Sequence, residues 1–220
     1  MSGFSTDVGA VVVGIVGCTG AVGIEIITVL EKLAFPVSKL HLFASARSAG
    51  KIISTGYGDI TVEEFSVPSA RKCCYLFLAV SGEFALEHAE AICEGNGPIV
   101  IDNSSAFRYM DHIPLVVPEI NAHAIGSSKL IANPNCTTAI AAVALWPIHQ
   151  KFGIKKLIVS TYQAASGAGA EVSDLLLLTM SSELFLTMAC FLEDIHLPSK
   201  SQLLNCKYPG HGRTYEGDTS

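Results

Sequence analysis

Charged residues are scarce in this sequence, and basic residues do not cluster in it. Asp, Glu, Lys and Arg make up 15% of the 220 residues, and the formal net charge is -6. A surface that binds nucleic acid needs a stripe of Lys and Arg, so no nucleic-acid partner is predicted. Hydrophobic residues make up 50% of the chain and the mean hydropathy is +0.44. This composition excludes intrinsic disorder and predicts an ordinary hydrophobic core.

The sequence also lacks the cysteine patterns of metal sites and secreted scaffolds. Its seven cysteines include no C-x-x-C pair and their number is odd, so we predict neither a metal site nor a disulfide framework. The first ten residues, MSGFSTDVGA, contain no basic segment, and we expect neither a signal peptide nor a transit peptide there. We therefore expect a reducing compartment, the cytoplasm. A plastid is the alternative if a transit peptide is missing from this chain.

The first 132 residues alternate between strand and helix patterns. Helical spacing of apolar residues occurs at Val22–Leu33 and Glu83–Cys93. Apolar runs typical of strands buried on both faces occur at Ala10–Val16, Leu40–Ala44, Tyr75–Val80 and Ile99–Ile101. Strands that alternate with helices form parallel sheets. We therefore predict an α/β fold, with a doubly wound parallel (Rossmann-type) dinucleotide-binding domain over residues 1–132.

A second domain, over residues 133–220, is predicted to begin where the sequence changes character. The run LIANPNC ends a strand in an Asn-Pro-Asn turn. A buried helix is predicted from Thr137, kinked or ended near Pro147, followed by a strand over Leu157–Tyr162. Residues 175–192 are strongly apolar, but Glu183 near their centre makes a membrane span costly. We expect a buried helix or one that seeks a protein partner there, and no membrane contact.

A glycine-rich loop, GCTGAVG, directly follows the first predicted strand and opens the first predicted helix. In that context glycines permit a tight turn and a close backbone approach, and the helix N-terminus offers free N–H donors to phosphate. Gly14, inside the strand, fits a close-packing role. The alternative is a plain glycine-rich turn. The predicted cofactor-binding positions of this loop are Gly17, Thr19, Gly20, Ala21, Val22 and Gly23.

The loop after the second predicted strand indicates which dinucleotide binds. An NAD enzyme usually places Asp or Glu there to hold the ribose 2′-hydroxyl, whereas this chain has Ser-Ala-Arg-Ser-Ala-Gly-Lys over residues 45–51. Arg47 with Ser48 can hold a 2′-phosphate through charge-assisted hydrogen bonds. We therefore predict NADP rather than NAD. The alternative is that Arg47 is a solvated loop charge.

Cys136 is the candidate nucleophile because it lies between the Asn-Pro-Asn turn and the predicted helix. The positive end of a helix dipole lowers the pKa of a thiol at the N-terminus and favours the thiolate. A thiolate can attack an aldehyde or an acyl phosphate. Position alone leaves open an inert core cysteine, which is the commoner role.

Six motifs occur in order and together resemble one family. They are GCTGAVG, ASARSAGK, VIDNSSAFR, LVVPEIN, ANPNCTT and STYQAASGAG. They are similar to aspartate-semialdehyde dehydrogenase of the bacterial and plant-like kind, over about residues 12–170. Glyceraldehyde-3-phosphate dehydrogenase and N-acetyl-glutamyl-phosphate reductase are the less similar alternatives.

The resemblance implies NADP-dependent, phosphate-requiring interconversion of aspartate semialdehyde and aspartyl phosphate, on the path to lysine, threonine and methionine. It implies that Cys136 is the acyl-thioester nucleophile, that Gln163 orients the substrate and that Arg108 holds phosphate. Asn135 is assigned to substrate or phosphate binding with them. It adds Ser166 and Gly167 to the cofactor contacts, together with Thr19–Val22, Arg47 and Ser48. Singly, each has a plainer alternative: a surface ion pair for Arg108, an ordinary polar residue for Gln163, and a flexible turn for residues 166–169.

The resemblance ends at about Ala170, which leaves an incomplete α+β substrate domain with a divergent tail from about residue 171. The Lys, Arg and His that the family uses for phosphate, carboxylate and proton transfer have no counterpart, since neither His196 nor His211 has the family's sequence context. We therefore expect a truncated member that binds NADP but turns over substrate feebly. The resemblance implies a homodimer or pairing with a full-length subunit. The alternative function is a non-catalytic NADP-binding or interaction protein.

Overall fold

Six parallel strands form one sheet in the computed structural model, which describes residues 11–159. Their order across the sheet is β5-β2-β1-β6-β7-β8. The strands are β1 (Val11–Val16), β2 (Val37–Ala44), β5 (Glu63–Glu64), β6 (Tyr75–Leu78), β7 (Ile99–Asp102) and β8 (Leu130–Ala132). Every pairing between neighbours is parallel. The chain fills the sheet outward from β1 in both directions, so the predicted doubly wound α/β fold is confirmed.

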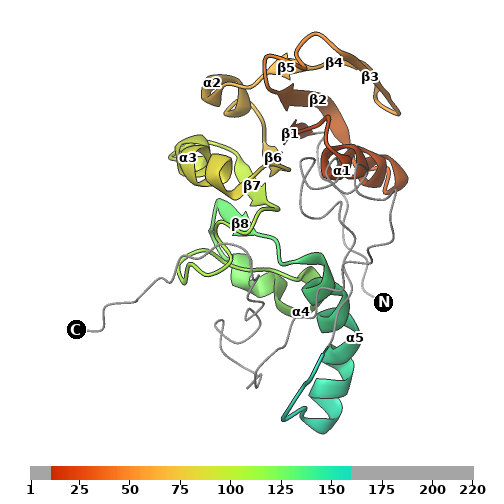
Figure 1. Cartoon of the computed structure of the whole chain (residues 1–220), viewed down its shortest axis with the longest axis vertical. Helices are drawn as coiled ribbons and strands as arrows, with labels where there is room; N and C mark the ends of the chain where they lie inside the picture. Colours follow the sequence, from red (N-terminus) through yellow and green to blue (C-terminus); the bar gives the residue numbers. More distant parts are fainter. Residues whose placement is uncertain (1–10, 160–220) are drawn as a thin grey trace, which may run out of the picture.

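Helices cover both faces of this sheet (Figure 1). One face carries α1 (Ala21–Lys32), and the opposite face carries α2 (Val67–Ala70) and α3 (Gly82–Cys93). Beyond β8 the chain forms three further helical segments: α4 (Pro118–Asn121), the 3-10 helix η1 (Ala122–Ile125) and α5 (Cys136–Phe152). The long helix α5 extends away from the sheet.

The central strand β1 is buried on both faces, as its unbroken apolar sequence predicts. Val13 and Ile15 lie in the core under α1, whereas Val16 lies in the core under α3. Successive side chains of a strand point to opposite faces, so one strand supplies both cores. Burial on both faces accounts for a continuous apolar run where a half-exposed strand would alternate.

Gly14 allows the segment after α2 to pack directly on β1. A Cβ atom at this position would lie 2.5 Å from Leu76 Cδ1 and 2.7 Å from Cys73 Sγ. Real Cβ atoms do not approach other atoms so closely, so the predicted close-packing role of Gly14 is confirmed.

A β-hairpin was not predicted from the sequence. It consists of β3 (Ile52–Thr55) and β4 (Gly58–Thr61), which form a separate antiparallel sheet. Its residues are mostly exposed or half-buried, and Ile53 and Ile60 pack against the core under α1. Because few apolar residues of the hairpin are buried, the sequence has no long hydrophobic run there.

Two predictions at the end of the described region are wrong in part. Helix α5 begins next to the expected Thr137, at Cys136, but it continues through Pro147 to Phe152 and none of its residues is buried, so the expectation of a buried helix that ends near Pro147 is wrong. Proline removes a single helical hydrogen bond, and the helix ends where Gly153 adopts a positive φ of 68° and donates to the His149 carbonyl. No strand occurs at residues 157–159, because no strand within residues 11–159 pairs with them. Residues 160–162 and the apolar segment 175–192 lie outside the described residues.

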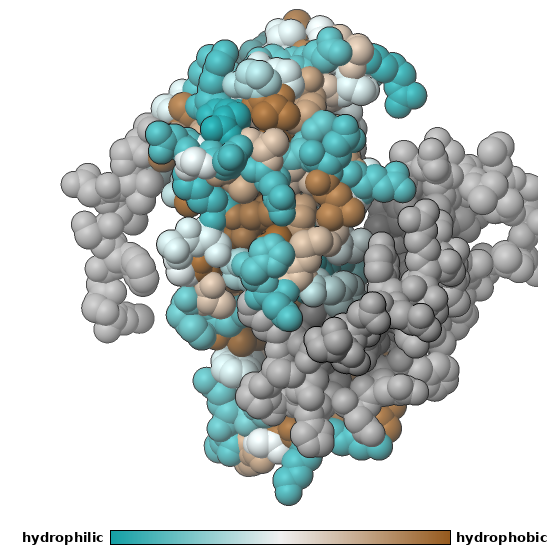
Figure 2. Space-filling model, turned by 90° about the vertical axis from the view of Figure 1, so that its left-hand side faces the viewer, coloured by the Kyte–Doolittle hydropathy of each residue, from teal (hydrophilic) through white to brown (hydrophobic). Residues whose placement is uncertain are grey.

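The face that carries α2 and α3 has small apolar patches bordered by polar side chains (Figure 2). Within residues 11–159, no helix is long and apolar enough to cross a membrane.

We expect Gly14→Ala to lower the free energy of unfolding by about 1–3 kcal/mol, because the added methyl group overpacks the core. Urea denaturation of the two proteins measures this difference. Gly82→Ala is the matched control, since a Cβ atom there has no neighbour nearer than 3.7 Å. An equal loss of stability in both variants would contradict the close-packing role.

Candidate active site at the carboxyl edge of the sheet

The loop after β1, residues 17–23, presents mainly backbone atoms to its surroundings and is called the glycine cradle. Gly17 has a φ of +83°, and a Cβ atom on it would lie 2.2 Å from the Ala79 carbonyl oxygen. A Cβ atom on Gly23 would lie 2.3 Å from the Gly17 carbonyl oxygen. The first glycine therefore makes the turn, and the last lets α1 pack on the end of the strand, as in dinucleotide-binding folds.

The N-terminus of α1 is open to an anion. Its N-cap residue is Gly20, and no side chain caps the first turn. The first amides of a helix have no partner within it, and Thr19, Ala21 and Val22 are exposed. Uncapped amides next to a glycine turn fit the pyrophosphate of a dinucleotide. The residues present in this loop therefore fit a dinucleotide cofactor.

The loop after β2 lies beside this cradle because the amides of Gly17 and Cys18 donate to the Phe43 carbonyl, at 2.9 and 3.3 Å. Within it Arg47 is exposed, and it makes no hydrogen bond or ion pair to any residue in the range 11–159. Ser48 is buried, and its hydroxyl lies 3.5 Å from Lys51 Nζ. The sequence analysis did not select Lys51, which adds a second positive charge to this loop.

A buried carboxylate organises the loop after β7. Asp102 is fully buried and accepts hydrogen bonds from Ser104 N at 3.1 Å and Ser104 Oγ at 2.7 Å. The same hydroxyl accepts from Ala106 N at 3.1 Å. Burial raises the pKa of Asp102, while the bonds from Ser104 and the charge of Arg108 lower it. These contacts fix the turn that leads to Arg108.

Arg108 links the loops that follow β7 and β8. Its Nε donates to the Asn133 carbonyl at 2.9 Å, and its Nη2 donates to the Asn103 carbonyl at 3.0 Å. The two asparagines also meet directly, Asn133 Nδ2 donating to Asn103 Oδ1 at 2.7 Å. Sequence reasoning missed Asn103 and Asn133, although each directly follows a buried strand, where polar residues often serve a site. The Arg108 side chain is therefore tied to the backbone carbonyl groups of both loops.

Cys136 is exposed and is the first residue of α5. Asn135 is the N-cap of the helix, and its Oδ1 accepts from Thr137 N at 3.0 Å and from the Thr137 hydroxyl. The cysteine Sγ lies 4.0 Å from the same oxygen. The predicted substrate residue Asn135 thus has a capping role, which fixes the direction of the first turn around the thiol.

These loops share one edge of the sheet because all six strands run parallel. The glycine loop and the Arg47 loop are neighbours there, and so are the Arg108 loop and the Cys136 turn. Gln163, Ser166 and Gly167 lie outside the described residues. Among residues 11–159, no three His, Cys, Asp or Glu side chains gather as a metal ion would require.

Comparison with known proteins gives two matches to family models. Residues 12–128 match "Semialdehyde dehydrogenase, NAD binding domain", and residues 145–197 match "Semialdehyde dehydrogenase, dimerisation domain". The chain belongs to the semialdehyde dehydrogenase family. The second match extends past residue 170, where the quoted motifs end, and much of it lies outside the described residues.

Aspartate-semialdehyde dehydrogenases are the relatives that this chain resembles. The enzyme of Synechocystis sp. is 43% identical over 159 residues, which are 72% of this chain and 47% of that protein. The crystal structure of aspartate semialdehyde dehydrogenase II from Vibrio cholerae superposes with a TM-score of 0.69 at 38% identity, covering 81% of this chain and 56% of the other. The Candida albicans enzyme with NADP has a TM-score of 0.59 at 28% identity, covering 71% and 52%. The chain spans about half the length of the curated relatives it matches.

The buried carboxylate gives a prediction about stability and pH. Between 3.8, the ordinary pKa of Asp102, and its raised value, the folded chain binds more protons than the unfolded chain. The contribution of Asp102 to the free energy of unfolding therefore falls as the pH rises through this interval. The Asp102→Asn variant lacks this titrating group, so its free energy of unfolding does not show that fall. The free energy of unfolding of the variant minus that of the wild type therefore rises through the interval and stays constant above it. Urea denaturation at a series of pH values measures it, and a difference independent of pH would contradict the assignment.

Proposed function

We propose that this chain carries the cofactor site and the nucleophile of an NADP-dependent, phosphate-requiring interconversion of L-aspartate 4-semialdehyde and L-4-aspartyl phosphate. The observation that carries the proposal is the exposed Cys136 at the first turn of α5, on the sheet edge that also bears the glycine cradle. The path to lysine, threonine and methionine and a cytoplasmic location belong to the same proposal. They rest on the resemblance to the relatives alone.

The order of the strands supports this arrangement. β1 and β8 are three strands apart, so at about 4.8 Å per strand the glycine cradle and the Cys136 turn begin about 14 Å from each other. A dinucleotide with its pyrophosphate on the cradle extends along this edge toward the thiol. Ligands of open parallel sheets bind outside the carboxyl ends of the strands, near the point where the strand order reverses.

Each residue at the edge has a defined role in the proposal. The Cys136 sulfur adds as a thiolate to the aldehyde carbon. NADP held by the glycine loop would supply the hydride acceptor for this step, and loss of hydride from the carbon would leave a thioester on Cys136. Phosphate then displaces the thiolate, with the Arg108 guanidinium attracting its negative charge. The resemblance to the relatives assigns substrate orientation to Gln163 and further cofactor contacts to Ser166 and Gly167, which lie outside the described residues.

A second candidate function is a non-catalytic NADP-binding subunit that pairs with a full-length member of the family. One observation favours it: residues 145–197 match a dimerisation domain. A homodimer of this chain is the corresponding assembly for the first candidate. Light scattering of the chain alone and mixed with a complete homologue separates these assemblies by mass.

Trapping the thioester tests the catalytic proposal. We expect the full chain, incubated with NADP and aspartate semialdehyde without phosphate, to gain the mass of the acyl group in an intact-mass measurement. Cys136→Ser should abolish the gain because the nucleophile is lost. Cys74→Ser is the matched control, since Cys74 is exposed and precedes β6 at the opposite edge of the sheet. Measurable NADP binding without an adduct would contradict catalysis by this chain and favour the second candidate.

The choice of cofactor gives a separate prediction. We expect Arg47→Ala to weaken NADP binding about 10- to 100-fold and to leave NAD binding nearly unchanged, because only the 2′-phosphate loses a charge-assisted hydrogen bond. Calorimetric titration with both nucleotides measures this, and Lys32→Ala, an exposed charge on α1, is the control. Tighter binding of NAD by the wild type would contradict the assignment. It would instead point to Glu64, which pairs with Ala44 at the end of β2.

A further inference from the structure

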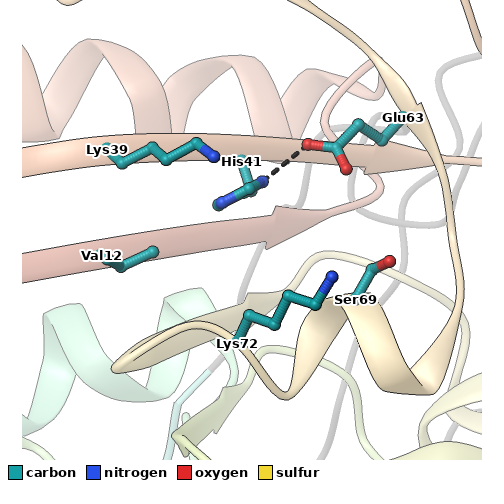
Figure 3. A pocket seen from close by; sticks show the side chains of 6 residues that line it. All are labelled: Val12, Lys39, His41, Glu63, Ser69 and Lys72. Atoms are coloured by element: carbon teal, nitrogen blue, oxygen red, sulfur yellow. Dashed lines mark hydrogen bonds and ion pairs between the residues drawn. The ribbon is translucent and has the colours of Figure 1, made fainter.

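A pocket of about 370 Å³ lies on the face of the sheet that carries α2. Its floor is formed by Val12 of β1 with Lys39 and His41 of β2. Its walls are Glu63 of β5, Ser69 of α2 and Lys72, which follows the end of α2 by two residues; residues 67–72 are called the α2 segment. Figure 3 shows the polar ends of these side chains gathered around one space. The pocket contains none of the residues placed at the carboxyl edge.

The pocket exists because α2 covers only part of the sheet. At Gly14 the chain after α2 packs against β1, where a Cβ atom would lie 2.7 Å from Cys73 Sγ. One strand further out, β5 pairs with β2 only at Phe43 and Ala44. The side chains of β2 before that pairing, Lys39 and His41, therefore line a hollow beside α2.

The polar lining has an excess of positive charge. Glu63 Oε1 lies 2.6 Å from His41 Nδ1, so this carboxylate already has a partner. Lys39 and Lys72 are exposed, and neither ammonium group makes a hydrogen bond or ion pair to a residue in the described part of the chain. Two ammonium groups without a carboxylate partner beside one hollow fit an anion.

The other groups of the pocket define the ligand more closely. Ser69 Oγ can donate to an anionic oxygen, and Glu63 can accept from a hydroxyl or amine of the same ligand. A volume of about 370 Å³ is in the range of pockets for small organic molecules. The lining therefore supplies donors and an acceptor for a polar organic ligand.

We propose that the pocket between β2, β5 and α2 binds a small organic phosphate, with the phosphate group between Lys39 and Lys72. Val12 contacts the carbon part of the ligand, and Ser69 and His41 complete the polar contacts. This site is separate from the phosphate that the proposed reaction consumes, which belongs to the carboxyl edge with Arg108. The ligand bridges the outer part of the sheet and α2, and so holds the two together.

Nuclear magnetic resonance of the ¹⁵N-labelled full chain tests this proposal, with inorganic phosphate and glycerol phosphate as probes. We expect saturable shifts of the Lys39, Ser69 and Lys72 amides, and none with chloride at the same ionic strength. The pair Lys39→Met and Lys72→Met should weaken binding about tenfold or more, because two charge-assisted contacts are lost. The pair Lys32→Met and Lys155→Met removes the same charge elsewhere and should leave the affinity unchanged.

Four outcomes would overturn the proposal. The first three are the absence of these shifts in the wild type, equal shifts with chloride, and an unchanged affinity in the Lys39 and Lys72 pair. Shifts confined to residues around Asn103 and Cys136 also overturn it, since they place phosphate only at the carboxyl edge. That pattern would leave the proposed function standing, so the two proposals fail separately. The positions of the shifted amides in the wild type show which site binds phosphate. The test therefore does not depend on whether the double variants fold.

Discussion

The backbone contact between the end of β1 and the start of α1 is the constraint on which the cofactor site depends. The Gly17 carbonyl lies where a side chain on Gly23 would begin, so the helix starts against the strand without a spacer. Parallel pairing of β1 with β2 and β6 then brings the other loops to the same edge. The uncapped amides of α1 consequently face the crevice where the strand order reverses, which is the usual ligand position in such folds.

A second fixed region lies at the other end of that edge and is built from polar groups instead of glycines. The buried Asp102 holds the turn that carries Arg108, and Arg108 holds the carbonyl of Asn133, three residues before Cys136. No buried side-chain nitrogen or oxygen within residues 11–159 is without a partner. Since a partly satisfied buried network is costly, loss of one member should disturb the rest, and the direction of the thiol depends on all of them.

The sequence was sufficient for the sheet, because strands buried on both faces leave apolar runs such as Val11–Val16 that few other structures produce. It was insufficient for the hairpin at residues 52–61, where burial is slight, and for the end of α5, where the positive φ of Gly153 and not Pro147 ends the helix. The hydrogen bond between Asn103 and Asn133 joins two residues that are 30 positions apart in the sequence. It requires the register of β7 with β8, which no local pattern contains.

Protection of a sheet edge is an alternative explanation for lysines in this pocket, but the geometry allows it for only one of the two. Lysine on an outer strand prevents pairing with another chain, and β5 leaves the outer side of β2 before Phe43 without a strand partner among residues 11–159. Lys39 alone could serve this purpose. Lys72 belongs to the α2 segment, not to a strand, yet it faces the same hollow. Edge protection therefore does not account for the second charge, whereas binding of an anion accounts for both.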